Sequence, residues 1–432
     1  MSIAQSRKEA DRSNGGNFIG GSGCESNQPP KTPGRLNVLA HKPHTSARID
    51  NPLQRVAALG QSIWLDGIDH NMIESGELGE LITQDGLCGV NLDPSTRARS
   101  VASWHDYDED IRTRALVGQS ASDIYDALNI RDAQDAADEF LPQYERTDGK
   151  DGYVSLGLNP HLAHDVSESI AEARRVWAAL DRSNVFIKVP ATVAGLAVIE
   201  QLISEGINVN ATLLFGLQRY RQVLDAYLTG IEARVEQGKS VRRVASIASF
   251  SVSPADAIAE PILENFIEQD SEPADLAEEL QGHIAIAIAT VAYRINQEKF
   301  ASDRFQRLAK EGARVQRLLW TDCGDASNPH CSDVQYVDAL IAPDTVNSLA
   351  RPTLAAYRHH GEPRSRLEID VGQAYQILQC LPGLGIDIDA MAQHLEDEGV
   401  NTCKAQYDKL LGTLDVAANT AIQRERPKRL HS

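Results

Sequence analysis

The sequence of 432 residues contains few cysteines, few aromatic residues and no long hydrophobic run. Its six cysteines include no CxxC pair, which argues against a structural zinc site and is typical of free thiols in a reducing compartment. The longest apolar stretch, 284–293, is far shorter than the roughly 20 residues that span a bilayer. The first residues lack the basic and then apolar pattern of a secretory signal. We therefore expect a cytoplasmic protein without membrane contact.

Positive charge is also scarce, because 42 Lys and Arg residues stand against 61 Asp and Glu residues, a formal net charge of −19. Such an acidic surface repels phosphate groups, so nucleic-acid binding is not expected.

A nucleotide-binding loop is missing as well. QGKS at 237–240 resembles the end of one, but Ala233 stands where its first glycine is needed. We expect no cofactor.

Two histidines, His161 and His164 in HLAH, have a spacing that occurs in metal sites on helices. No third ligand is evident in the sequence. Surface or capping histidines are the favoured interpretation, and no metal is expected.

Composition divides the chain into three parts. Residues 1–50 are rich in Gly, Ser, Asn, Pro and charge and have little to bury, which predicts a disordered tail. Residues 51–362 alternate short apolar runs with segments of helical periodicity. Residues 363–432 are predicted to form a helical extension packed against the preceding domain.

Eight apolar runs are candidate strands of a parallel sheet buried on both faces. They are SIWLDGI (62–68), LCGVNLD (87–93), YVSLGL (153–158), VFIKVPA (185–191), NVNATLLF (208–215), VASIASFSV (244–252), RVQRLLW (314–320) and QYVDALIAP (335–343). Their alternation with helices predicts an α/β fold, a (β/α)8 TIM barrel with a helical C-terminal extension, with an open doubly wound sheet as the alternative. The expected helices include the insert 96–150, 167–182 with Ser167 as N-cap, 194–206 with a glycine C-cap, and 372–425 with a break near Pro382 and Gly385.

Lys188 lies in the middle of VFIKVPA, where every neighbour is apolar. Burial of a lysine amine disfavours its charged form, and a neutral amine is what imine formation with a carbonyl requires. The alternative is a structural lysine paired with a carboxylate on a neighbouring strand. The barrel favours catalysis, because barrels place their chemistry at the C-terminal ends of strands.

Residues 51 to about 415 resemble the transaldolase family, the Schiff-base class I aldolases on a (β/α)8 barrel. The likeness is strongest in the IKVPAT and GINVNATLLF blocks of 184–220, and it continues through SIWLDGI, ARVQRLLW, LIAPDTVNSL (340–349) and 385–411. The resemblance implies a transferase of carbohydrate metabolism with a small carbonyl or sugar-like substrate. A homodimer is left open.

The resemblance also assigns catalytic roles by position. Lys188 is similar to the imine-forming lysine, and Asp66 matches the aspartate that helps proton transfer at the substrate hydroxyl. Asn210 and Thr212 match the pair that holds the intermediate and an active-site water.

Two departures from the family affect proton transfer. In VSLGLNP, Gly157 stands where the family carries the glutamate that activates the catalytic water. In GVNLDPS, Asp93 replaces an asparagine and adds a carboxylate. We expect Asp93 to be a catalytic residue that takes over part of the missing acid–base function.

Other departures affect substrate binding. Ser249 matches the serine that begins the phosphate-binding segment, and Asn91 and Ser251 are also expected to bind substrate, although Ser251 replaces an aromatic residue. Pro254 stands at the position of the phosphate-binding arginine, and a family lysine is missing from 320–329.

Gly216 replaces a serine that often follows LLF in the family. Arg219, Arg242 and Arg243 are the candidates to replace the missing arginine from a nearby loop.

Three functions are compatible with these patterns. The retained catalytic positions favour an active lysine-imine enzyme with a shifted substrate or reaction, as in specialised metabolism. The second is an ordinary transaldolase of the pentose phosphate pathway, which moves a three-carbon ketol unit between sugar phosphates such as sedoheptulose 7-phosphate and glyceraldehyde 3-phosphate. The third is a catalytically silent barrel that serves as a binding or regulatory subunit.

Overall fold

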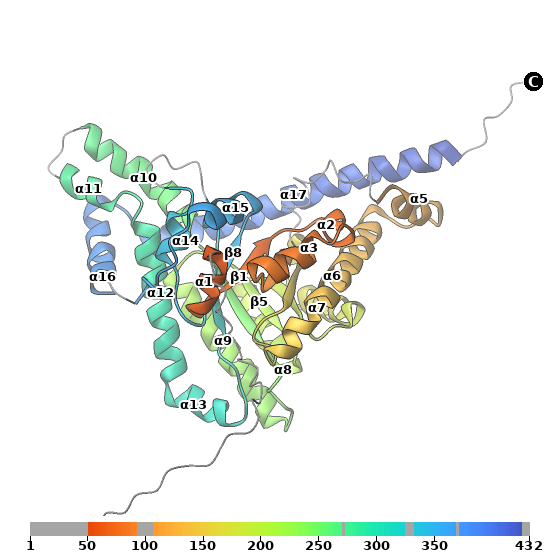
Figure 1. Cartoon of the computed structure of the whole chain (residues 1–432), viewed down its shortest axis with the longest axis horizontal. Coiled ribbons are helices and arrows are strands. Elements are labelled where there is room, and N and C mark those ends of the chain that lie inside the picture. Colours follow the sequence, from red (N-terminus) through yellow and green to blue (C-terminus); the bar gives the residue numbers. More distant parts are fainter. Residues whose placement is uncertain (1–50, 93–106, 270–272, 325–331, 369–370, 426–432) are drawn as a thin grey trace, which may run out of the picture. The chain divides into compact units, whose positions relative to one another are not determined.

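The computed structural model of the chain describes residues 51–92, 107–269, 273–324, 332–368 and 371–425. Eight parallel strands pair in sequential order and close into a barrel, in which β1 is hydrogen-bonded to β8 (Figure 1). Helices alternate with the strands, and further helices follow β8. The predicted (β/α)8 barrel with a helical C-terminal extension is therefore confirmed, and the open sheet is excluded.

The strands are β1 (Ser62–Asp66), β2 (Gly89–Leu92), β3 (Tyr153–Gly157), β4 (Val185–Pro190), β5 (Val209–Leu214), β6 (Ser246–Ser251), β7 (Arg317–Thr321) and β8 (Val346–Leu349). The helices as far as β5 are α1 (Pro52–Ala58), α2 (His70–Glu74), α3 (Glu77–Glu80), η1 (Leu81–Asp85), α5 (Asp108–Leu116), α6 (Ala121–Arg146), η3 (Pro160–Leu162), α7 (Val166–Leu180) and α8 (Val193–Glu205). Those after β5 are α9 (Leu217–Glu236), α10 (Ser253–Glu268), α11 (Ala274–Leu280), α12 (Ile284–Ala301), α13 (Asp303–Lys310), α14 (Gln335–Ala339), α15 (Arg351–His360), α16 (Val371–Cys380), η4 (Leu381–Leu384) and α17 (Ile388–Glu425).

The first seven predicted strands are confirmed with small shifts at their ends, but the eighth is wrong. Most of 335–343 forms helix α14 and the turn after it, and β8 comes later in the chain. Val337 and Leu340 are buried with the spacing of a helix turn, and so short an apolar run does not distinguish a helix from a strand. The true strand was missed because its two central residues are polar, although they are buried.

Aromatic side chains close the floor of the barrel at the N-terminal ends of the strands. Trp64, Tyr153 and Phe186 are at most 2% exposed, and the ring centroids of Tyr153 and Phe186 lie 4.4 Å apart. Gly89 makes room for them, since a Cβ at this position would lie 2.5 Å from the Trp64 ring. Barrels of this fold hold their active sites at the opposite, C-terminal end.

Capping residues set the ends of the predicted helices. The predicted N-cap of α7, Ser167, is wrong, because Asp165 is the N-cap and its side chain accepts a hydrogen bond from the Glu168 N–H (3.0 Å). A carboxylate at this position also interacts favourably with the helix dipole. The glycine C-cap of α8 is confirmed, because Gly206 has a φ of 89°.

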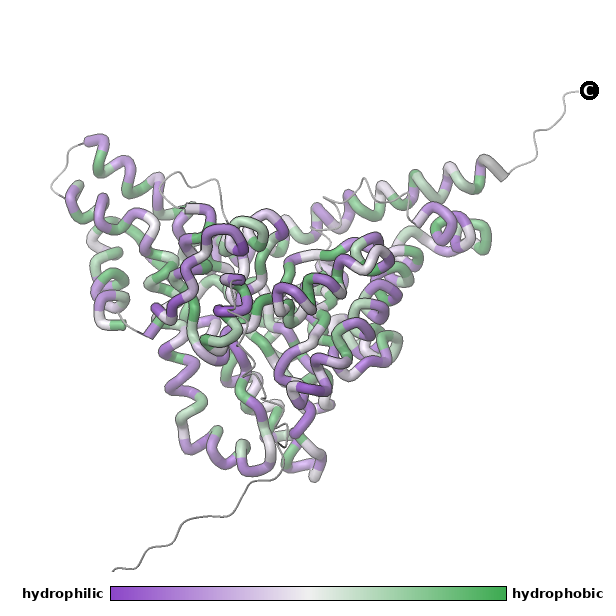
Figure 2. Tube along the Cα trace, in the orientation of Figure 1, coloured by the Kyte–Doolittle hydropathy of each residue, from purple (hydrophilic) through white to green (hydrophobic). Residues whose placement is uncertain are grey.

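The predicted helical C-terminus is confirmed as α16, η4 and α17, with its break around Pro382 and Gly385. α17 contacts β5, α5 and α6, and Figure 2 shows hydrophobic and hydrophilic positions interleaved along it. Among the described helices, none is both long and apolar enough to cross a membrane. Residues 1–50 lie outside the described part of the chain, and the boundary after 362 stays a prediction.

Arg317 is a buried cation at the start of β7, and we expect its loss to destabilise the fold. Its guanidinium donates to the Asp151 carboxylate (2.9 Å) and to Ser62 Oγ (2.6 Å). The Arg317→Met variant leaves Asp151, which is 14% exposed, without its cation, so the free energy of unfolding should fall by about 3–5 kcal/mol in denaturant titration.

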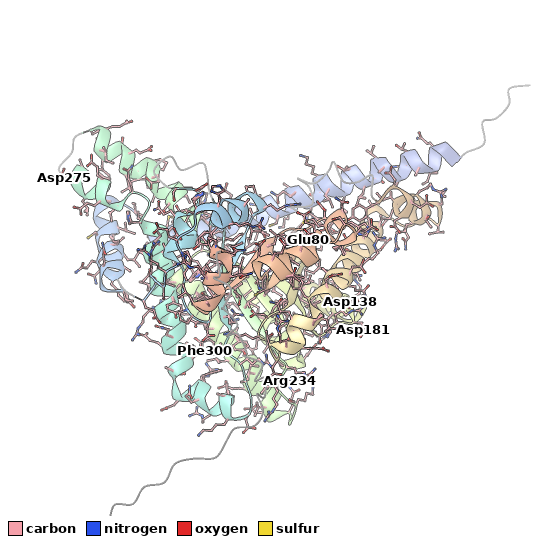
Figure 3. All side chains as sticks on the ribbon, viewed as in Figure 1. Glu80, Asp138, Asp181, Arg234, Asp275 and Phe300 are labelled. Carbon is pink, nitrogen blue, oxygen red and sulfur yellow. The ribbon has the colours of Figure 1, made fainter. Side chains whose placement is uncertain are left out.

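The matched control is Arg182→Met. Arg182 pairs with Asp138 on the surface (Asp138 is labelled in Figure 3), and such pairs contribute about 1 kcal/mol or less. Equal losses of stability in the two variants would contradict the structural role of Arg317.

Candidate active site

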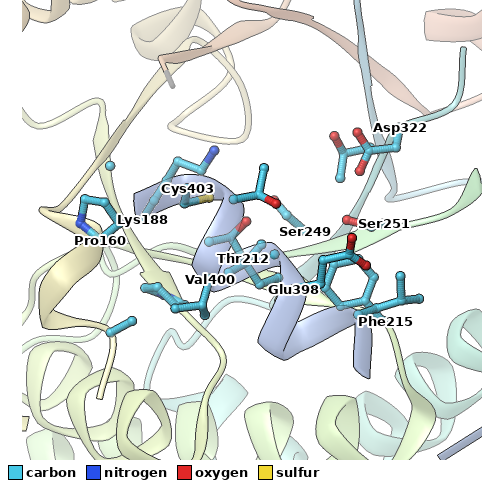
Figure 4. Close-up of a pocket in the computed structure, with 18 of the residues that line it drawn as sticks. Pro160, Lys188, Thr212, Phe215, Ser249, Ser251, Asp322, Glu398, Val400 and Cys403 are labelled. Carbon is cyan, nitrogen blue, oxygen red and sulfur yellow. The ribbon is translucent and has the colours of Figure 1, made fainter. Parts of the chain in front are cut away.

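A cavity of about 440 Å³ opens at the C-terminal ends of the strands, where barrels of this fold hold their active sites. Strands β1 to β7 contribute to its lining, and so does α17. In Figure 4, Lys188 lies on one side of the cavity and Asp322 on the other. The predicted site residues that line it are Asp66, Asn91, Lys188, Thr212, Ser249 and Ser251.

Lys188 lies in β4 and is 8% exposed. Its partners in the strand register are Gly157 on β3 and Asn210 on β5. Asp66, the last residue of β1, lines the same cavity. Lys188 therefore lies on the fourth strand, as expected from the sequence, and lines the cavity at the barrel mouth.

A layer of buried polar side chains hydrogen-bonds across the barrel. Ser249 Oγ donates to Asn210 Oδ1 (2.7 Å), and Asn210 Nδ2 donates to Ser155 Oγ (2.9 Å). Asn91 Nδ2 donates to Ser348 Oγ (2.8 Å). All five residues are at most 3% exposed. Because buried amides with several partners are held in one orientation, this layer fixes Asn91 at the cavity and Asn210 next to it.

Thr212 lies beside an irregularity of β5. The pairing of β5 with β6 shifts between Ala211 and Leu214, and Leu213 has a φ of 57°, which is rare for a residue with a side chain. Thr212 and Leu213 therefore both line the cavity, although neighbours in a regular strand face opposite sides. Strain of this kind concentrates at functional sites.

Sequence reasoning missed the contribution of α17 to the cavity. Leu395, Gly399, Cys403 and Gln406 line it with the spacing of one helix face. Gly399 allows a close approach, because a Cβ there would lie 3.1 Å from the Leu213 side chain. The helical spacing was visible in the sequence, but nothing there indicated which face of so long a helix covers the barrel.

The two glycines that depart from the family pattern have different physical surroundings. At Gly216, a Cβ would lie 2.6 Å from that of Ala392 on α17, so packing explains the loss of the serine. At Gly157, φ is not positive and a Cβ would meet no described atom within 4 Å. The space beside Lys188 is therefore open, and neither the backbone nor the packing of the described residues requires a glycine there.

Hydroxyl and carboxylate groups lie on the side of the cavity away from Lys188. Ser251 and Asp322 lie there (Figure 4), and Pro254 lines the cavity from the first turn of α10. Proline suits a helix start but has no N–H to offer an anion. Cys323, which follows Asp322, is not a nucleophile, because burial raises the pKa of its thiol well above the ordinary value.

The first turn of α10 is held in place by a buried carboxylate. Asp256 accepts hydrogen bonds from the Tyr336 hydroxyl and from the Ala285 N–H, each at 2.8 Å. Burial raises the pKa of Asp256 to about 6. These bonds fix the position of Pro254 two residues earlier.

None of the three candidate replacement arginines lines this cavity. Arg219 Nε donates to Glu396 Oε2 (2.9 Å) in a separate cavity between α9 and α17. Arg242 and Arg243 line a cavity at the N-terminal ends of the strands. Among the residues that the structure describes, Lys188 is the only lysine or arginine that lines the cavity at the barrel mouth, which also contains three carboxylates.

Asp93 and residues 325–329 of the predicted loop lie outside the described residues. The surface interpretation of the two histidines is confirmed: both are exposed, and His161 Nε2 lies 2.7 Å from Asp408 Oδ1.

One group of described residues has metal-ligand spacing, namely His70, Asp132 and Asp135. Asp132 accepts a hydrogen bond from the Tyr107 hydroxyl (2.6 Å), and Arg131 Nε lies 3.7 Å from it. The Arg131 guanidinium thus already faces the Asp132 carboxylate, which a metal ion would also need. None of these three residues lines the cavity at the barrel mouth.

Known proteins resemble this chain over most of its length. Residues 63–414 match the family model described as Transaldolase/Fructose-6-phosphate aldolase. A protein of Nostoc sp. named Transaldolase 2 is 39% identical over 370 residues, which cover 84% of this chain and 97% of that protein. A protein of Saccharopolyspora erythraea named Transaldolase is 41% identical over 363 residues, with coverage of 84% and 96%. Another named Transaldolase, from Mycobacterium bovis, is 38% identical over 376 residues, with coverage of 86% and 99%.

Proposed function

Since the chain belongs to the transaldolase/fructose-6-phosphate aldolase family, we propose that its Lys188 forms a Schiff base with a carbonyl substrate. Membership makes the chain an enzyme of the transferase and aldolase kind. The observation that carries the proposal is the position of Lys188, buried in β4 and facing the cavity at the barrel mouth. Chemical trapping of the imine with borohydride tests it.

The proposed reaction begins when the Lys188 amine adds to the substrate carbonyl and water leaves. The protonated imine then withdraws electrons, and the carbon–carbon bond one position further along the chain breaks. Its electron pair stays on the bound fragment, and the hydroxyl of the departing carbon loses its proton and becomes an aldehyde. We assign this proton to Asp66, which lines the cavity at the end of β1. Addition of the bound fragment to a second aldehyde reverses these steps.

The remaining predicted residues position the intermediate. We assign Thr212 to the active-site water and Asn210 to the bound fragment, because the hydrogen bond from Ser249 holds the Asn210 amide in place. Asn91, Ser249 and Ser251 are proposed to bind substrate hydroxyl groups from the cavity wall. Asp93 is proposed as the second acid or base.

We further propose that the substrate carries no phosphate at the end away from Lys188. Among the described residues, that end offers hydroxyl groups and a carboxylate but no guanidinium, and Pro254 offers no N–H. The second candidate is the ordinary transaldolase reaction between sugar phosphates. Its support is the near-complete coverage of the relatives named transaldolase.

Calorimetry with fructose 6-phosphate separates the two candidates. We expect weak binding by the wild type, and binding at least about tenfold tighter by Pro254→Arg, because a charge-assisted hydrogen bond to phosphate contributes roughly 1.5–3 kcal/mol. Pro254→Gln, which restores the N–H without a charge, is the control. Micromolar binding by the wild type would instead favour the ordinary transaldolase.

A further inference from the structure

The N-terminal end of the barrel holds a second cavity of about 550 Å³, at the opposite end from the proposed active site. It lies between the floor of the barrel and the loops that enter β3, β6 and β7. We propose that this cavity binds a polyvalent phosphate-type anion. The proposal is independent of the Schiff-base chemistry, because no residue lines both cavities.

The charge of this cavity is opposite to that of the protein. Its lining includes the cations Lys150, Arg242, Arg243, Arg314 and Arg317 but only two acids, Asp148 and Asp344. The whole chain carries a formal net charge of −19. Basic side chains are therefore concentrated at a hollow of an acidic protein, where they attract anions from solution.

Ion pairs neutralise three of the five cations. Arg317 pairs with Asp151 (2.9 Å), Lys150 with Asp344 (2.7 Å) and Arg314 with Asp148 (3.6 Å). Within the described residues, the side chains of Arg242 and Arg243 form no ion pair or hydrogen bond. Arg242 and Arg243 are consecutive, exposed residues at the rim of the cavity, and their guanidinium groups thus remain without carboxylate partners.

The rim is anchored to the barrel. Arg314 Nε donates to the Arg242 carbonyl (2.8 Å) and Arg314 Nη2 to the Asp148 carbonyl (2.6 Å), which joins the loop after α9 to the loop before β3. The Tyr153 hydroxyl donates to the Gly149 carbonyl (2.7 Å). These bonds hold the backbone of the loop that carries Arg242 and Arg243, so the two side chains start from fixed positions at the rim.

Trp64 forms part of the floor of this cavity. Its side chain is 1% exposed and its indole N–H is enclosed, so Trp64 contributes a ring to the floor and no hydrogen bond to an anion. The guanidinium fork matches phosphate geometry, and the volume lies within the range of small-molecule sites.

The experiment is calorimetric titration of the full chain with inorganic diphosphate at low ionic strength. The variant Arg242→Gln/Arg243→Gln is expected to bind at least about a hundredfold more weakly than the wild type, because each lost charge-assisted contact corresponds to about tenfold or more in affinity. The matched control is Arg221→Gln/Lys409→Gln, which removes two exposed positive charges outside both cavities and should bind as the wild type does.

A second readout locates the bound anion. Diphosphate should change the intrinsic fluorescence of the wild type but not that of a Trp64→Phe variant, since Trp64 forms part of the floor. Absence of diphosphate binding by the wild type, or equal binding by the Arg242→Gln/Arg243→Gln variant, would overturn the proposal. Equal weakening in the charge-matched control would also overturn it, because binding would then reflect overall charge alone.

Discussion

Replacement of Lys188 by methionine is expected to lower turnover by at least about a thousandfold, because the methionine keeps the length of the side chain but has no amine to form the imine. Turnover should be measured with fructose and erythrose, both with and without their phosphates. Circular dichroism and thermal unfolding should show that the variant is folded, since a flexible apolar side chain suits the buried position.

The comparison for this prediction is Cys403→Ser, a change on the α17 face of the same cavity. It should retain most of the activity, because no covalent role is proposed for Cys403. A Lys188→Met variant that keeps more than about a tenth of wild-type turnover would show that Lys188 is structural.

Replacement of Gly157 by glutamate is expected to accelerate imine formation by roughly tenfold to a hundredfold. Gly157 is the register partner of Lys188, and a side chain there meets no described atom at its first carbon. A positioned carboxylate can transfer protons to and from the water that leaves as the imine forms, and such help contributes typically 10²–10⁴-fold. The measurement is the initial rate of adduct formation with dihydroxyacetone, quenched with borohydride at increasing times.

Two further variants show whether the carboxylate itself causes the acceleration. Gly157→Gln fills the same space without a carboxylate and should give no acceleration. In Gly157→Glu/Asp93→Asn, both family-like residues are restored, so the proton transfer should depend on the glutamate alone. Equal rates for the glutamate and glutamine variants would contradict a role for acid–base chemistry at this position.

The fold was largely predictable because parallel strands buried on both faces are continuous apolar runs, as in VFIKVPA and NVNATLLF. The exception was β8, in which Asn347 and Ser348 lie at the centre of a buried strand. Ser348 is satisfied there, because its hydroxyl accepts a hydrogen bond from Asn91 across the barrel. Such a partner lies far away in the sequence and leaves no local pattern.

The candidate site was predictable where a residue lies on a strand and less so elsewhere. Lys188 was singled out from its apolar surroundings, with a structural lysine as the alternative, and the family resemblance then favoured catalysis. The structure places it in the lining of the cavity. Gln406 on α17 and Leu213 in the β5 bulge were missed, because their access to the cavity depends on tertiary packing and on an irregular backbone. The expectation that Arg219 replaces the missing arginine was wrong for a similar reason. Its guanidinium pairs with Glu396 on α17, outside the candidate active site.

The most direct test of the Schiff-base proposal is peptide mapping after reduction. The wild-type chain should be incubated with dihydroxyacetone, reduced with borohydride and digested, and the peptides should be analysed by mass spectrometry. The three-carbon adduct is expected on Lys188, and the Lys188→Met variant should acquire none above background. An unmodified Lys188, or an adduct spread over exposed lysines such as Lys239 and Lys409, would contradict imine catalysis at this site.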